Sequence, residues 1–120
     1  MRRSLFEQYG GFARVNRVVA SFYDKVLESP VVGHYFHGID MKRLIDHQTK
    51  FIASLMGGPA SYTNEQLERA HEGLGITEPA FREVIELLRE TLEEFDFENE
   101  HIQQIEDAMM SRKAFVISRD

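Results

Sequence analysis

The chain has 120 residues, a formal net charge of −6 and no cysteine. This length supports one compact domain over residues 1–120, and without cysteine there are no disulfides, thiolate metal sites or cysteine nucleophiles. The acidic balance argues against nucleic-acid binding, which needs a basic face. No apolar run approaches the roughly 18 residues of a membrane span, and the N-terminus lacks the apolar region of a secretory signal. We therefore expect a cytoplasmic protein with no membrane partner.

The spacing of apolar residues predicts helices along nearly the whole chain and no strands, so the expected fold class is all-α. The first long helix covers residues 15–26 and ends at Ser29-Pro30, because proline breaks a helix. Asp40 is the expected N-cap of a second long helix, which stops at the glycine pair before Pro59.

Three further helices are predicted after residue 60. Residues 63–66 are typical of a capping box that opens a short helix through His71. Thr77-Glu78-Pro79 begins a longer helix with an apolar stripe over residues 81–95. The last helix carries the apolar residues Ile102, Ile105, Met109 and Val116.

His71 lies on the apolar face of the short helix, since Leu67, Ala70, His71 and Leu74 follow helical spacing. Such an imidazole is either a core histidine hydrogen-bonded to a carbonyl or an axial ligand presented to a haem iron. His34 and His37 are three residues apart in a segment bounded by glycine. We interpret them as surface histidines, because this pair alone lacks the further ligands that a metal site needs.

Two polar side chains interrupt the apolar stripes of the long helices, Tyr23 in the first and Gln48 in the second. A buried phenol or amide is costly without a hydrogen-bond partner. The two groups therefore either bond to each other or to other core groups, or point at a ligand held between the helices.

Taken in order, these residues resemble the truncated haemoglobins of group I. The matching residues are Tyr9-Gly10-Gly11, Phe22-Tyr23, Tyr35-Phe36, Leu44, His47-Gln48, Phe51, Gly57-Gly58-Pro59, Ala70-His71, Gly73, Gly75 and Ile76. The resemblance covers nearly the whole chain. It implies a two-over-two helical sandwich around non-covalent haem b.

The resemblance also implies a role for individual residues. His71 would be the proximal iron ligand, while Tyr23 and Gln48 would hydrogen-bond a distal diatomic ligand. Phe36 would pack on the porphyrin face, and Arg43 would pair with a haem propionate. The other implied lining residues are Leu44, Phe51, Leu67, Ile76, Phe81 and Val84.

Three positions distinguish branches of this family. His47 resembles a histidine that binds iron when no gas is present; the alternative is a histidine at the solvent edge near a propionate, and both stay open. Ile52 stands where nitric-oxide-detoxifying relatives carry a phenylalanine thought to gate a ligand tunnel. The branch that cross-links haem uses a histidine in the last helix, whereas His101 lies at the start of that helix, so we expect no covalent attachment.

The implied function is reversible binding of oxygen or another diatomic gas (CO or NO), as in oxygen transport. The alternatives are a nitric oxide dioxygenase supplied by an external reductase and a haem-based gas sensor. Outside this family, the alternatives are a helical interaction module or a histidine-based metal site. We expect a monomer or weak homodimer.

Overall fold

The computed structural model describes residues 3–59, 66, 71 and 75–117. Every regular element in these ranges is a helix, which confirms the all-α prediction. The elements are α1 (Leu5–Gln8), α2 (Gly11–Glu28), the 3₁₀ helix η1 (Gly33–Phe36), α3 (Met41–Leu55), α5 (Glu78–Glu94), α6 (Asn99–Met110) and the 3₁₀ helix η2 (Lys113–Phe115).

Two helices begin where the sequence predicts, and each is capped by a side chain, Asp40 as predicted and Thr77 as the structure shows. The Asp40 carboxylate accepts a hydrogen bond of 3.3 Å from the Arg43 amide at the start of α3. The Thr77 hydroxyl accepts one of 3.3 Å from the Ala80 amide at the start of α5. Each bond satisfies an amide that has no partner within its own helix, which fixes where the helix begins.

Two features of the helices differ from the sequence prediction. The short helix α1 was not predicted, and its N-cap is the Ser4 hydroxyl, which accepts a hydrogen bond from the Glu7 amide. Val116 was expected in the last helix, but α6 ends at Met110 and Val116 follows η2. The α6 helix can end there because the Ser111 hydroxyl and the Arg112 guanidinium both donate to the Ala108 carbonyl.

The predicted capping box near residue 63 is mostly outside the described residues. Gln66 and His71, the two described positions of that segment, are both helical.

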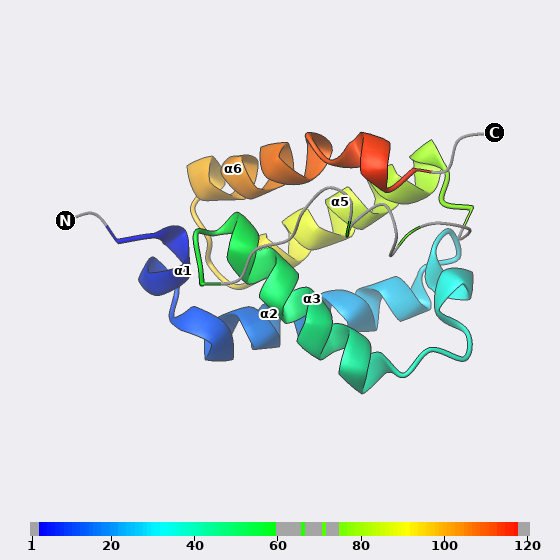
Figure 1. Ribbon diagram of the computed structural model, residues 1–120, viewed down its shortest axis with the longest axis horizontal. Helices are drawn as coiled ribbons and strands as arrows, with labels where there is room; N and C mark the ends of the chain where they lie inside the picture. Colours follow the sequence, from blue (N-terminus) through cyan, green and yellow to red (C-terminus); the bar gives the residue numbers. More distant parts are fainter. Residues whose placement is uncertain (1–2, 60–65, 67–70, 72–74, 118–120) are drawn as a thin grey trace.

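The four long helices form two pairs, in which α2 crosses α3 and α5 runs alongside α6 (Figure 1). The pairs pack together through α2 and α5. Apolar residues from all four helices fill the core between them, including Val15, Val19, Val26, Ile52, Leu88, Leu92, Ile102 and Ile105. None of the described helices is both long and apolar enough to cross a membrane.

Candidate functional site

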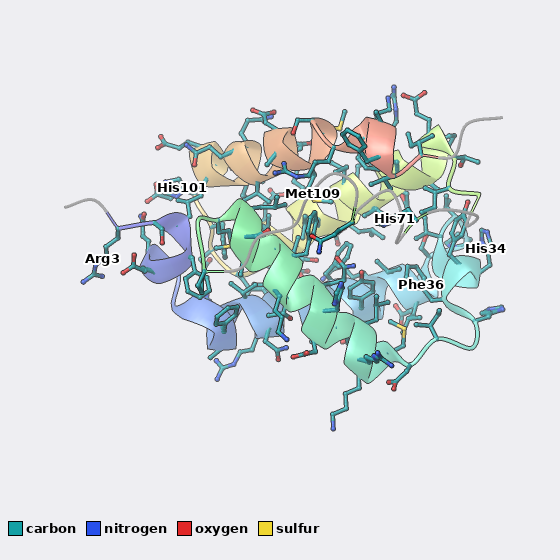
Figure 2. The ribbon with its side chains drawn as sticks, in the orientation of Figure 1. Arg3, His34, Phe36, His71, His101 and Met109 are labelled. Atoms are coloured by element: carbon teal, nitrogen blue, oxygen red, sulfur yellow. The ribbon has the colours of Figure 1, made fainter. Side chains whose placement is uncertain are left out.

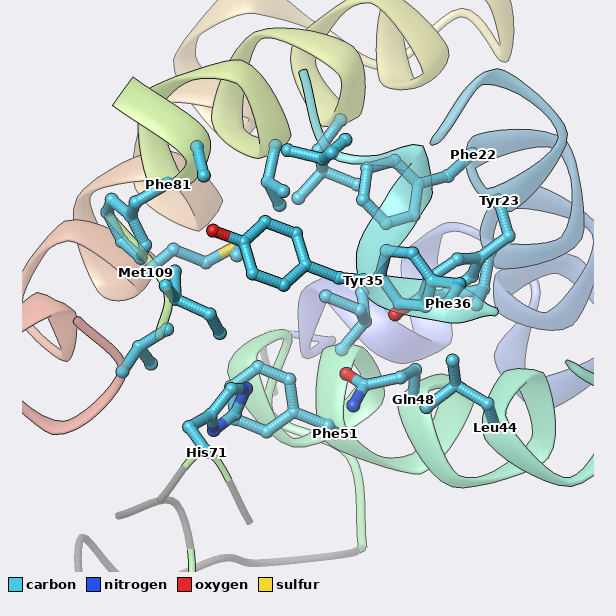
Figure 3. Close-up of a pocket in the computed structure, with 18 of the residues that line it drawn as sticks. Phe22, Tyr23, Tyr35, Phe36, Leu44, Gln48, Phe51, His71, Phe81 and Met109 are labelled. Carbon is cyan, nitrogen blue, oxygen red and sulfur yellow. The ribbon is translucent and has the colours of Figure 1, made fainter. Parts of the chain in front are cut away.

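A cavity of about 350 Å³ lies between the two helix pairs, and its walls come from α2, η1, α3, α5, α6 and the segments around His71 and Val116 (Figure 3). This volume is in the range of small-molecule and cofactor sites. The predicted site residues that line it are Tyr23, Phe36, Leu44, His47, Gln48, Phe51, His71, Ile76, Phe81 and Val84. Helices that are distant in sequence therefore bring most of the candidate residues to one place.

Tyr23 reaches the cavity from α2 and is only 7% exposed. Its ring packs edge to face against the rings of Phe22 and Phe36, with centroid distances of 4.8 and 5.7 Å. No residue in the described part of the chain hydrogen-bonds to its hydroxyl. Burial raises the pKa of the phenol above its ordinary value. Tyr23 therefore stays protonated and can donate a hydrogen bond into the cavity.

Gln48 faces Tyr23 from α3, one helical turn after Leu44 on the same side of the helix (Figure 3). Its side chain is half-buried. The sequence left open whether Gln48 and Tyr23 satisfy each other. No hydrogen bond joins them, and none joins Gln48 to any other described residue. The carboxamide can therefore donate to, or accept from, a molecule in the cavity.

His71 is half-buried, and its imidazole points into the same cavity (Figure 3). Its surroundings are apolar and aromatic, and the cavity extends from it toward Gln48 and Tyr23. An imidazole presented on an apolar wall can coordinate a metal through one ring nitrogen. A single imidazole suits a cofactor that supplies the other ligands of its own metal, and flat aromatic walls suit a planar cofactor. The residues present therefore fit haem.

Of the described site residues that were predicted, Arg43 is not among those that line the cavity; it is exposed in the first turn of α3. The predicted lining residue Leu67 lies outside the described residues. His34 and His37 are both exposed, as the interpretation of surface histidines expects. In the described ranges, no group of three or more histidine, aspartate and glutamate side chains is arranged to hold a metal ion.

Several lining residues were not identified from the sequence. They include Tyr35, Ile39, Met109, Arg112 and Val116. Met109 and Val116 belong to a recognised apolar stripe, but spacing alone does not distinguish a core position from a cavity wall. Arg112 reaches the cavity because the chain turns after the end of α6, which no residue pattern indicated.

His101 does not line the cavity and lies at the end of the molecule opposite His34 and His71 (Figure 2). It is 8% exposed and sits in the first turn of α6, as expected. A hydrogen bond of 2.6 Å joins its Nδ1 to the Tyr9 hydroxyl, which also accepts one of 3.1 Å from the Glu98 amide. The Tyr9 ring stacks on Phe97 with centroids 3.8 Å apart. His101 is therefore part of a structural cluster far from the cavity.

The chain matches the family model described as bacterial-like globin over residues 4–118. It is 32% identical over 115 residues to the group 1 truncated hemoglobin of Tetrahymena pyriformis, covering 96% of this chain and 88% of that protein. The solved Fe(III) form of the Tetrahymena pyriformis truncated hemoglobin superposes with a TM-score of 0.88 at 28% identity, covering 98% and 100% of the two chains. The 2/2 hemoglobin of a Synechococcus species, solved in the cyanomet state with covalently attached heme, gives a TM-score of 0.88 at 29% identity and the same coverage.

A two-over-two helical sandwich with a histidine facing an apolar cavity has the architecture of a haem-binding globin. The chain belongs to the group I truncated haemoglobins. The resemblance seen in the sequence is therefore confirmed. Globins of this family bind haem.

Proposed function

We propose that the protein holds haem b non-covalently and binds oxygen reversibly, with CO and NO as competing ligands. The observation that carries the proposal is the placement of Tyr23 and Gln48. Both bring polar groups with no described hydrogen-bond partner into an apolar cavity that His71 enters from the proximal side. A polar group that faces an apolar cavity is stabilised when a bound molecule supplies its hydrogen-bond partner.

Each of these residues has a distinct role in the proposal. When bound, haem supplies an iron coordination position at which a diatomic gas binds reversibly. His71 holds the cofactor through its imidazole, and Phe36 packs against the ring. Tyr23 and Gln48 donate hydrogen bonds to the distal ligand, and these bonds are strong where the accepting oxygen carries negative charge. Arg43 pairs with a haem propionate, and Leu67 belongs to the apolar lining.

His47 lines the cavity from α3, next to Gln48. This placement supports both proposed roles, a sixth iron ligand in the gas-free state and a residue at the propionate edge. Adjacent residues on a helix are about 100° apart around its axis, so coordination by His47 requires the helix to rearrange.

Non-covalent attachment is supported by the position of the last histidine. The covalently attached heme belongs to the Synechococcus protein, whereas here α6 contains no histidine after His101. His101 itself is bonded to Tyr9, away from the cavity. We further propose that residues 1–120 act as one cytoplasmic domain, as a monomer or weak homodimer.

A haem titration followed by absorption spectroscopy tests the proposal. We expect one equivalent of haem to give a Soret band, and His71→Gly to lose the axial ligand and regain it with added imidazole. His37→Gly is the matched control, because His37 is exposed and outside the cavity lining. A chain that gives no Soret band would reject haem binding. A high-spin ferric spectrum that His47→Ala leaves unchanged would reject His47 as the sixth ligand.

A further inference from the structure

The 3₁₀ helix η1 is firmly attached to the rest of the fold. The buried Gly33 at its start donates an amide hydrogen bond of 3.0 Å to the Ser29 carbonyl. A Cβ on Gly33 would lie 2.9 Å from the Leu27 carbonyl oxygen, so η1 packs directly on the end of α2. The Ser29 hydroxyl in turn donates a hydrogen bond of 2.7 Å to the Glu83 carboxylate on α5. Through these contacts η1 has a fixed position relative to both helix pairs.

Tyr35 extends from η1 to Gly75, two residues before the N-cap of α5. Its ring lines the cavity, and its hydroxyl donates a hydrogen bond of 3.1 Å to the Gly75 carbonyl. The His34 ring packs on the Tyr35 ring at a centroid distance of 4.2 Å, which restricts the ring further. A hydroxyl held in this way can fix the position of the backbone to which it bonds.

Gly75 is the point where the chain leaves the His71 segment and approaches α5. It follows His71 by four residues and precedes Thr77, the N-cap of α5, by two. Its φ of +69° is a conformation that glycine adopts readily and other residues rarely do. The Tyr35 bond therefore anchors the backbone at Gly75, close in sequence to both His71 and the start of α5.

We infer that Tyr35 is a positioning residue for His71. Its hydrogen bond to Gly75 ties the His71 segment to η1, the same short element that carries Phe36. The bond thereby limits how far the proximal imidazole can move relative to the ring that packs on the cofactor. This inference rests on the proposed haem function.

The experiment uses the haem-loaded protein and Tyr35→Phe, which removes the hydroxyl and keeps the ring. We expect haem loss to an excess of a haem-free globin acceptor to become about 3- to 10-fold faster, the effect of losing one ordinary hydrogen bond. We also expect the iron–histidine stretching band in the resonance Raman spectrum of the ferrous protein to shift or broaden. This band responds to the His71 position and not to overall stability.

Tyr9→Phe is the matched control, because it removes the same hydroxyl from a tyrosine outside the cavity. It should leave both the haem-loss rate and the Raman band at their wild-type values. A Tyr35→Phe protein with a wild-type rate and band would overturn the inference while leaving the proposed function intact. If the wild-type chain takes up no haem, the proposed function fails and the inference fails with it.

Discussion

Two tyrosines in opposite regions of the molecule, the half-buried Tyr9 and the buried Tyr23, use their hydroxyl groups differently. The Tyr9 hydroxyl forms a hydrogen bond with His101 and accepts another from the Glu98 amide, so the polar atoms of this cluster satisfy one another. The Tyr23 hydroxyl bonds to no described residue and faces a cavity lined mostly by apolar groups. Buried polar groups in folded proteins are nearly always paired. The difference separates a cluster that stabilises the fold from one that is arranged around a bound molecule.

The largest expected effect is on oxygen dissociation and concerns Tyr23, the tyrosine that faces the cavity. Tyr23→Phe should speed oxygen dissociation by about 10- to 100-fold, because a hydrogen bond to a charged acceptor contributes about 1.5–3 kcal/mol. Stopped-flow mixing of the oxygenated protein with an excess of CO measures this rate. Tyr9→Phe should have the wild-type rate. An unchanged rate in Tyr23→Phe would show that its hydroxyl does not bond to the ligand.

For the free energy of unfolding, the order of the two variants should be reversed, with the larger effect in Tyr9→Phe. Tyr9→Phe leaves the Glu98 amide and the His101 ring without their partner, so we expect a loss of about 1–3 kcal/mol in the free energy of unfolding. Tyr23→Phe removes a buried hydroxyl that bonds to no described residue, and should leave this free energy unchanged or slightly higher. Urea unfolding of the haem-free protein measures both. Equal losses in the two variants would contradict the distinction drawn between the clusters.

The sequence predicts the elements of this fold better than it predicts contacts between them. The helix starts at Asp40 and at Thr77-Glu78-Pro79 are local signals, and the Asp40 and Thr77 side chains form capping hydrogen bonds there. The bond between Tyr9 and His101 joins residues 92 positions apart, and no spacing rule relates them.

The candidate site shows the same limit. Tyr23 and Gln48 could be identified because a polar residue interrupts an apolar helical stripe, which is visible in the sequence. Tyr35 sits in a short 3₁₀ helix with no such stripe. Its bond to Gly75 depends on how two distant turns meet, and no residue pattern indicates it.

The smallest expected effect is a pH dependence that belongs to Tyr23 alone. Burial raises the pKa of the Tyr23 phenol in the folded protein, whereas the unfolded chain releases this proton near the ordinary value of 10.0. Above that pH the folded state binds more protons than the unfolded state, so the free energy of unfolding falls as pH rises. Between about pH 9 and about pH 10.5 this linkage lowers it by about 0.5–1 kcal/mol.

The linkage is measured by urea unfolding of the haem-free wild type and Tyr23→Phe at these two pH values. The other tyrosines and the lysines also titrate in this range, but they are common to both proteins. The wild type should therefore lose more stability than Tyr23→Phe, and the excess is the contribution of the buried phenol. Equal losses would mean that the phenol ionises in the folded protein as readily as in the unfolded chain. In that case its hydroxyl would be hydrated, and the cavity would lack the apolar character that makes Tyr23 a strong hydrogen-bond donor to a bound gas.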